Sequence, residues 1–494
     1  MNGMGNTTRL PRTASTLVAA VEKDICASAH ASSAILLAEW LARFLFANHC
    51  GIYSFAHIEA ALAAKFDSVT FAGTRNPVLH VASELYAHGG HTRLMKNLLS
   101  GMDATSRKTA ITRGAKREEI AVLLGIDSGE VAVFEQTDES EKVVALAAYF
   151  VQFERIVLHL HPDDVTAAVA LAVAKKSCPQ LKIYFVNHSD HTFSVAVGVA
   201  DCILELSAYG WSLATERRVE WRRSFIGIPI ALSGAAIGEA RRSDLVLTGG
   251  SAYKFKPNGE AGLVGAFAKL LSADRTLSVV AVGPRRRDYW WWLLKLRFPQ
   301  RFRTMARVPY PHYLSLLSSC ALYIDSHPIT GGTAFTEALM GGAKVSGRTG
   351  GPNGYGLADG LRQNGQAAFV EHCQALLRND AIANAEQERV RNDARHFHSL
   401  EAVQRRFQMT LFENVLCAPP TALRELRFDY DFRSDWIAGG RLIAVGFRTG
   451  SQLSLLPNLL GTMLRAGASP RFIVGSIVRA AAARLRLRTW KAVP

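Results

Sequence analysis

A glycine pair and a histidine stand where a predicted strand, 78–82, leads toward a predicted helix. They are Gly89, Gly90 and His91, with Arg93 two positions further on. Paired glycines let the backbone approach a ligand closely, and the free N–H groups of a helix start attract an anion. An imidazole there can accept a proton from a substrate. We therefore predict that His91 is a general base and that its glycine and arginine neighbours line an acceptor site; the alternative is a glycine turn with a solvent-exposed histidine.

Two further loops at predicted strand ends are rich in histidine and acidic residues. They are His159–Asp164 and Asn187–Phe193. Histidine beside a carboxylate suits acid–base chemistry or metal binding. Asp190 with His191 is a second predicted catalytic pair. The residues of these loops that we expect to shape the acceptor side of a cleft are His161, Asn187 and His188.

A metal site is the alternative interpretation of these loops. It requires His161, His188 and His191 to converge with Asp163 or Asp164. Hydrogen bonds that orient the loops, or contacts to an acceptor, account for the same polar residues without a metal. We therefore predict no metal site.

In the second half, the predicted strand 245–248 is followed by small residues and two lysines. Gly249 and Gly250 precede Lys254 and Lys256. Glycine amides and the point charge of lysine suit a diphosphate. We predict that the lysines bind a phosphorylated donor; a solvated loop is the alternative for either one.

The most informative segment runs from Asp325 to Leu339. A predicted strand ends at Asp325, and a Gly-Gly-Thr turn opens a helix with Thr333 at its N-cap. Backbone N–H groups at such a helix start can grip phosphate. The predicted donor-binding residues of this segment are Thr330, Gly331, Gly332, Thr333 and Glu337.

A second glycine-rich loop follows the next predicted strand, 344–346. Gly351 and Asn353 in this loop are also predicted to bind the donor. Ligands of open α/β sheets bind beyond the carboxyl ends of the strands. Two glycine-rich loops at neighbouring strand ends therefore indicate a nucleotide-sugar pocket.

These loops are positioned by short β-rich runs that alternate with helical stretches. The predicted strands are 78–82, 108–112, 131–134, 156–160, 182–186 and 202–206, then 245–248, 277–282, 303–307, 321–325 and 344–346. Such alternation predicts the α/β class, with two doubly wound parallel sheets in tandem. The predicted organisation is a helical N-terminal cap (1–76), a Rossmann-like acceptor domain (77–228), a linker (229–243), a Rossmann-like nucleotide-sugar domain (244–416) and a basic helical C-terminal tail (417–494).

The charge is concentrated at one end of the chain. The 494 residues include 57 Lys and Arg against 42 Asp and Glu, a formal net charge of +15, and 49% are apolar. From Trp436 to Pro494 there are nine basic residues and no acid, which leaves +6 on the rest. A basic tail suggests contact with an anionic surface rather than with nucleic acid. An amphipathic helix on a membrane and docking onto the protein's own surface are the two interpretations of this tail.

Scattered cysteines and short apolar runs bear on the compartment. The seven cysteines include no CxxC pair, which argues against a disulfide framework. No apolar run reaches the ~18–20 residues of a transmembrane helix, and the first residues do not resemble a signal peptide. We expect a cytoplasmic protein, or one peripheral on the inner face of the plasma membrane.

From about Pro77 to Leu416 these motifs resemble GT-B glycosyltransferases, in which two Rossmann-like domains face one another across a cleft. Asp325–Gly342 resembles their donor motif, a strand, a Gly-Thr turn and a helix with Glu-Ala-Leu followed by Gly-Gly. The chain is similar in particular to the branch with the protein O-GlcNAc transferases and the bacterial adhesin glucosyltransferases. It departs from that branch at Gly331-Gly332-Thr333, where the branch has a His-Thr-Thr type turn, and no tetratricopeptide array precedes the domain.

The resemblance implies roles for several residues. Lys254 or Lys256, with Thr330 and Thr333, would hold the UDP diphosphate. Glu337 would hold ribose hydroxyls, and His91 would face the acceptor.

The implied activity is metal-independent transfer of a hexosyl or N-acetylhexosaminyl group in polysaccharide biosynthesis. The donor would be a nucleotide sugar, with UDP expected, and the acceptor a glycan, a lipid-linked molecule or a protein. No cofactor and no nucleic-acid partner are expected, since no nucleic-acid-binding module is recognisable. A nucleotide-sugar 2-epimerase of the same fold and a non-catalytic glycan-binding protein are the alternatives.

Overall fold

The computed structural model describes residues 12–86, 90–214, 222–230, 242–257, 262–285, 287–306, 308–351, 353–426, 442–447 and 454–490. The chain divides into two compact units. Unit 1 comprises Met1–Leu204, Leu213–Arg223 and Asp431–Pro494, and unit 2 comprises Glu205–Ser212 and Ser224–Tyr430. The predicted cap and the part of the predicted tail from Asp431 onward thus belong to unit 1, because their apolar faces join its core. The first residues of the predicted tail, 417–430, belong to unit 2. Of the predicted linker, residues 231–241 lie outside the described part, and Arg242 already opens a strand.

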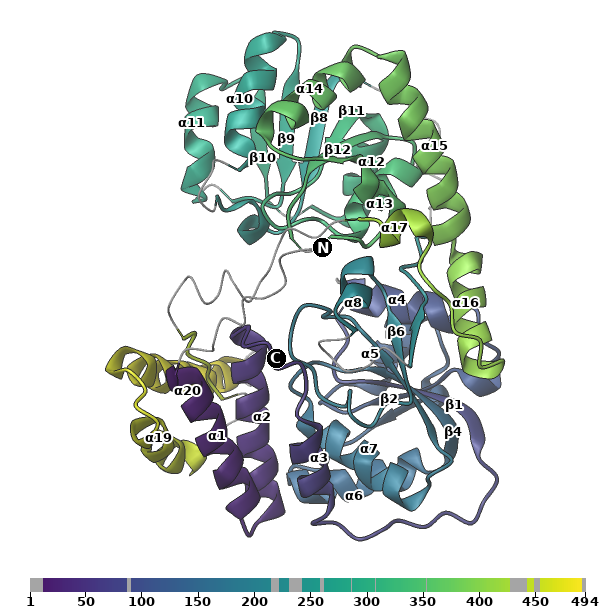
Figure 1. The fold of residues 1–494 in the computed structure, drawn as a ribbon, viewed down its shortest axis with the longest axis vertical. Coiled ribbons are helices and arrows are strands. Elements are labelled where there is room, and N and C mark those ends of the chain that lie inside the picture. Colours follow the sequence, from purple (N-terminus) through teal and green to yellow (C-terminus); the bar gives the residue numbers. More distant parts are fainter. Residues whose placement is uncertain are drawn as a thin grey trace, which may run out of the picture. The chain divides into compact units, whose positions relative to one another are not determined.

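The first sheet has the strand order β3-β2-β1-β4-β5-β6-β7. Its strands are β1 (Asn76–Ala82), β2 (Lys108–Ile111), β3 (Val131–Val133), β4 (Phe153–His159), β5 (Lys182–Val186), β6 (Cys202–Glu205) and β7 (Arg223–Phe225). The ladders from β3 to β6 are parallel, and Ala82 pairs with His159, so β1 and β4 end level. The carboxyl ends of the central strands therefore meet at one edge (Figure 1).

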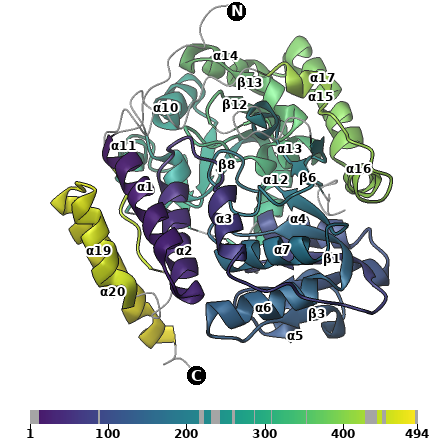
Figure 2. The ribbon, with the colours of Figure 1, turned by 60° about the horizontal axis from the view of Figure 1, so that its bottom comes forward.

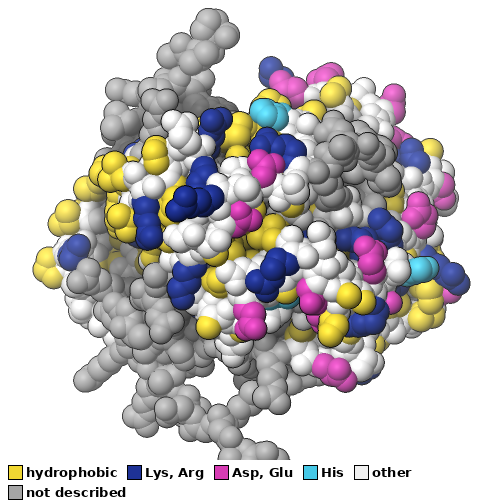
Figure 3. All heavy atoms as spheres, turned by 90° about the horizontal axis from the view of Figure 1, so that it is seen from above, with side chains coloured by type: hydrophobic (Ala, Val, Ile, Leu, Met, Phe, Trp, Pro, Cys, Tyr) yellow, Lys and Arg dark blue, Asp and Glu magenta, His cyan; other side chains and the backbone are white. Residues whose placement is uncertain are grey.

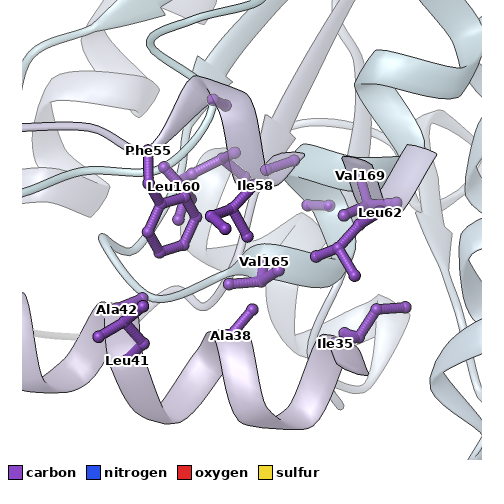
Figure 4. Packing of buried hydrophobic residues seen from close by; sticks show 14 of the residues in the cluster. Ile35, Ala38, Leu41, Ala42, Phe55, Ile58, Leu62, Leu160, Val165 and Val169 are labelled. Atoms are coloured by element: carbon purple, nitrogen blue, oxygen red, sulfur yellow. The ribbon is translucent and has the colours of Figure 1, made fainter. Parts of the chain in front are cut away.

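Helices cover both faces of this sheet. They are α4 (Gly90–Leu99), α5 (Arg117–Leu124), α6 (Glu139–Phe150) and α7 (Val165–Ser177). Because side chains alternate along a strand, Leu79 and Val81 join the core formed by α6 and α7, and Ala82 joins the core formed by α4 and α5. Outside α7 lie α2 (Ala31–Ala47) and α3 (Ala56–Ala63); Figure 4 shows Ala38 of α2, Ile58 of α3 and Val165 of α7 turned toward one another.

The C-terminal helices pack on the N-terminal ones. Helices α19 (Leu456–Arg465) and α20 (Pro470–Trp490) lie beside α1 (Arg12–Ala27) and α2 (Figures 1 and 2). Phe472 meets Phe44 edge to face at 6.0 Å, and the Asn48 amide bonds both backbone groups of Ile443, at 2.7 and 3.0 Å. These contacts support docking onto the protein's own surface; a membrane role for the tail stays a prediction.

Two surface properties bear on partners. No helix in the described ranges has the length and hydropathy to cross a membrane. On the face shown in Figure 3, Lys and Arg side chains are interspersed with Asp and Glu side chains.

The second sheet has the strand order β10-β9-β8-β11-β12-β13 with all ladders parallel. Its strands are β8 (Arg242–Gly249), β9 (Ser278–Val282), β10 (Phe302–Met305), β11 (Cys320–Ile324), β12 (Lys344–Arg348) and β13 (Arg362–Gln363). The helices that cover it include α10 (Leu263–Ala273), α12 (Tyr310–Ser319), α13 (Thr333–Met340), α14 (Gln366–Leu377) and α15 (Ala381–His398).

The predicted fold class is confirmed, and every predicted strand is present. The short strands β7 and β13 were not predicted, because two or three residues carry little pattern. The predicted helix 139–153 ends at Phe150, since Phe153 opens β4. The predicted helical stretch 381–416 breaks at Ser399, whose hydroxyl accepts a hydrogen bond from the Ala402 N–H and so caps α16 (Leu400–Phe412).

Candidate active site

Four histidines gather at the carboxyl edge of the first sheet. His80 lies in β1, His91 in the first turn of α4, His159 at the end of β4 and His188 just after β5. Nδ1 of His80 lies 3.2 Å from Nε2 of His159, and Nδ1 of His159 lies 3.1 Å from Nε2 of His188. The rings of His91 and His188 stack with centroids 4.0 Å apart. We call these four residues the histidine cluster.

Burial keeps the cluster uncharged. It lowers the pKa of His80 to about 3 and that of His91 to about 4, and it lowers the pKa values of His159 and His188 well below the ordinary value. A hydrogen bond with the backbone of His159 partly opposes the shift at His91. Within the described residues, Nε2 of His91 is buried and has no hydrogen-bond partner. A neutral imidazole with a spare lone pair can accept a proton.

The acidic residues of the neighbouring loop hold that loop in place. Asp164 accepts hydrogen bonds from Ser83 Oγ and Thr112 Oγ1, both at 2.5 Å, and caps α7. Asp163 accepts from Arg113 at 2.8 Å and from His161 Nδ1 at 2.6 Å. Burial alone would raise the pKa of Asp163, but Arg113 and His161 hold it well below its usual range. His161 is thereby directed to a carboxylate rather than to the cluster.

Asp190 and His191 form the predicted pair, with Oδ1 and Nδ1 3.0 Å apart. Asp190 is buried and His191 is partly exposed, so the ring remains accessible while its carboxylate fixes the orientation. Asn187 is buried at the end of β5, and its N–H donates to the Leu204 carbonyl. The ring of His191 lies 6.0 Å from that of His49 between centroids.

The metal set that was weighed as the alternative interpretation is not assembled in the described residues. The described residues that could share an ion are His91, His159 and His188. The alternative interpretation had required His161, His188 and His191 with an aspartate. His159 was named in the loop His159–Asp164 but was given no role, because it also lies within the predicted strand 156–160. Of the glycine pair, Gly89 lies outside the described residues; Gly90 begins α4, and Arg93 is half-buried.

In unit 2, Lys254 joins two strand-end loops. It lies in the 3-10 turn Ala252–Phe255 after β8, and its Nζ donates a hydrogen bond to the Thr330 carbonyl at 2.8 Å. Its own carbonyl accepts from the Ile329 N–H at 3.3 Å. Burial lowers the pKa of Lys254, and nearby Asp325 opposes that shift. Lys256, by contrast, is exposed.

A buried carboxylate shapes the turn before α13. Asp325 accepts hydrogen bonds from the Gly331 N–H, at 2.9 and 3.1 Å, and from Arg362 at 2.7 Å. Arg362 is also paired with Asp359 at 2.7 Å. A Cβ at Gly331 would lie 2.2 Å from Oδ1 of Asp325, so only glycine fits there.

The N-cap of α13 is Gly332, and the predicted N-cap, Thr333, is instead the first helical residue. Gly332 has φ +61°, a left-handed conformation that glycine adopts at little cost and that threonine would resist. One turn on, the Glu337 carboxylate accepts a hydrogen bond from the Tyr310 hydroxyl. Thr330 is buried, and its N–H donates to the Gly351 carbonyl at 3.3 Å, so the two predicted glycine-rich loops do lie together.

Three buried side chains beside these loops have polar atoms that no described residue bonds. Among the described residues, none bonds Nε or Nη1 of Arg348, Nδ1 of His327 or Oδ1 of Asn353. Arg348 ends β12, and it has no ion-pair partner in the described part of the chain. Its charge, after the effect of burial, helps to lower the pKa of His327 to about 4. Asn353 was predicted as a site residue; Arg348 and His327 were not, although both follow the rule that ligands bind at strand ends.

The chain matches no sequence family and no curated protein. Among solved structures it is similar to the Thermobaculum terrenum O-GlcNAc transferase, with 13% identity and a TM-score of 0.50 over 83% of this chain and 82% of that one. It is also similar to Anabaena HepE in complex with UDP, with 14% identity and a TM-score of 0.52 over 68% and 100%. A UDP-GlcNAc 2-epimerase from Neisseria meningitidis has 10% identity and a TM-score of 0.46 over 68% and 100%. The chain therefore has the GT-B fold, as the motifs predicted.

Proposed function

We propose that this chain is a glycosyltransferase that takes its sugar from a nucleoside-diphosphate sugar, with UDP as the preferred nucleotide. The observation that carries the proposal is the buried guanidinium of Arg348, whose Nε and Nη1 have no hydrogen-bond partner among the described residues, together with the turn held by Lys254. A buried charge is costly unless an opposite charge meets it. A diphosphate supplies that charge, and a structural neighbour was solved with UDP.

In the proposed reaction, the bond between the anomeric carbon and the diphosphate oxygen breaks while a bond to the acceptor oxygen forms. Negative charge develops on the departing diphosphate, and Lys254, Arg348 and the N–H groups at the start of α13 stabilise it. The acceptor proton passes to Nε2 of His91, with Asp190 and His191 as the second candidate. Glu337 holds the ribose hydroxyls. No metal is needed at the diphosphate, because protein cations supply the charge.

A thermal-shift screen of UDP, GDP, CMP and dTDP and their sugars tests the donor. We expect UDP and a UDP-sugar to raise the melting temperature, with Arg348→Met abolishing the shift. A labelled form of the nucleotide sugar that binds is then incubated with the protein and with glycan, lipid-linked and protein acceptors, in buffer with EDTA. Conversion of UDP-GlcNAc alone into its epimer would identify a 2-epimerase instead, and the absence of any nucleotide binding would leave a glycan-binding protein.

A further inference from the structure

Three imidazoles of the histidine cluster are arranged as ligands for one metal ion. One ring nitrogen from each of His91, His159 and His188 lies within 4.8 Å of the others. Zn–N bonds of about 2.0–2.1 Å in a tetrahedral site place ligand nitrogens roughly 3.4 Å apart. The 3.1 Å separation between His159 Nδ1 and His188 Nε2 is already close to that value. A small rotation of the His91 ring, from the stacked position, would complete the set.

The environment of these rings matches that of metal-binding histidines. A ligating histidine usually donates its second N–H to a fixed acceptor, which sets its tautomer and orientation. His80, fully buried in β1, provides Nδ1 at 3.2 Å from Nε2 of His159, which turns Nδ1 of His159 toward His188. Three of the four rings stand on or directly after the adjacent strands β1, β4 and β5, so the rigid sheet sets their spacing.

An unsatisfied atom points to a missing ligand. Nε2 of His91 is buried with no hydrogen-bond partner in the described residues, and a buried polar atom without a partner is destabilising. Burial also favours neutral imidazole, the form that coordinates metals, as the low pKa of His91 illustrates. A chain of hydrogen bonds between neutral rings would account for the positions of His80, His159 and His188. It would still give Nε2 of His91 no partner.

We propose that His91, His159 and His188 form a three-histidine site for Zn²⁺ or a similar divalent transition metal, with His80 as the outer hydrogen-bond partner. Three protein ligands leave a fourth position for water or a ligand oxygen. The sequence predicted no metal, and this site shares only His188 with the set considered there. Metal binding here does not depend on the proposed sugar transfer. If the proposed metal site and the proposed sugar transfer both hold, the metal ion and the acceptor proton compete for Nε2 of His91.

The test uses the full chain, stripped of metal with EDTA and titrated with Zn²⁺ and with Co²⁺. Metal content after gel filtration is measured by mass spectrometry, Co²⁺ coordination by visible absorption, and stability by thermal unfolding. We expect one equivalent bound, a raised melting temperature and a tetrahedral Co²⁺ spectrum without a thiolate band. His91→Ala, at a helix start, should weaken binding at least 10-fold, as should His188→Ala. The matched control His312→Ala removes an exposed histidine of α12 and should bind as the parent does.

Three outcomes would overturn the proposal. They are less than one equivalent bound by the parent, unchanged affinity in the folded His91→Ala variant, and a thiolate band that places the ion on cysteine. Folding of each variant is checked by circular dichroism. If His188→Ala does not fold, His91→Ala and the Co²⁺ spectrum still decide. Failure of sugar transfer with intact metal binding would count against the proposed function alone.

Discussion

The side-chain nitrogen of Lys254 lies 2.8 Å from the carbonyl oxygen of Thr330. This hydrogen bond ties the loop after β8 to the turn before α13, two segments that are 76 residues apart. The cation is thereby fixed at the turn where the sequence predicted a diphosphate. Lys256, two positions on, is exposed and follows the same short turn.

Replacing Lys254 by Ala should weaken UDP binding roughly 10- to 100-fold, because a charge-assisted hydrogen bond is worth about 1.5–3 kcal/mol. Lys256→Ala is the matched control and should change the dissociation constant less than threefold. Isothermal titration calorimetry with UDP measures both. Equal losses in the two variants would refute the distinction that the structure draws between these lysines.

Replacing Arg348 by Met should have opposite effects on binding and on stability. The variant removes a buried guanidinium without a partner in the described residues, so the nucleotide-free protein should become more stable. UDP affinity should fall at least 10-fold, since the diphosphate loses its cation. Thermal unfolding with and without UDP checks both effects. A lower melting temperature without nucleotide would show that Arg348 has a structural role instead.

His91→Ala should lose sugar transfer by about 10²- to 10⁴-fold while keeping UDP affinity, as expected for a general base. His312→Ala, at an exposed position, is the control. Because burial lowers the pKa of His91 to about 4, the base is neutral above that pH. As the pH is lowered, kcat/KM should therefore decline with a midpoint near pH 4 rather than near pH 6.5. Full activity in His91→Ala would leave Asp190 and His191 as the candidates.

Gly331→Ala should distort the donor turn, because the new Cβ would lie 2.2 Å from Oδ1 of Asp325. We expect a loss of about 1–3 kcal/mol in stability, typical of overpacking, together with weaker UDP binding. Gly360→Ala is the control, since a Cβ there meets no described atom within 4 Å. Chemical denaturation and UDP titration compare the two. Wild-type behaviour of Gly331→Ala would mean that the turn relaxes freely.

Glu59→Gln should reduce the pH dependence of stability. Glu59 is fully buried in α3 and bonds the Ala196 N–H at 2.8 Å; burial raises its pKa from 4.5 to about 7. The unfolded chain loses this proton near pH 4.5 and the folded chain only near pH 7, so folding becomes less favourable as pH rises between these values, by about 3 kcal/mol in all. The Gln variant should lack this decline, whereas the exposed Glu118→Gln should retain it. Melting curves from pH 4.5 to 8 provide the measurement.

Local pattern determined much of the fold. Apolar β-rich runs and intervening helical stretches encode two parallel sheets, because each strand must bury both faces. The rule that ligands bind at carboxyl strand ends then selected the loops of His91, His188, Lys254 and Gly331.

Only the tertiary structure decided which side chains meet. Strand order brings β1, β4 and β5 together, which joins His80 and His159 to His91 and His188 although about 80 residues separate the first two. Loop packing holds Lys254 against the Thr330 carbonyl while Lys256 stays exposed, and Arg348 is buried without a described partner. Residue type and spacing record local conformation, whereas proximity and desolvation depend on how distant strands are ordered and packed. The residue types of the loops therefore indicated the kind of chemistry, but the fold was needed to assign that chemistry to particular atoms.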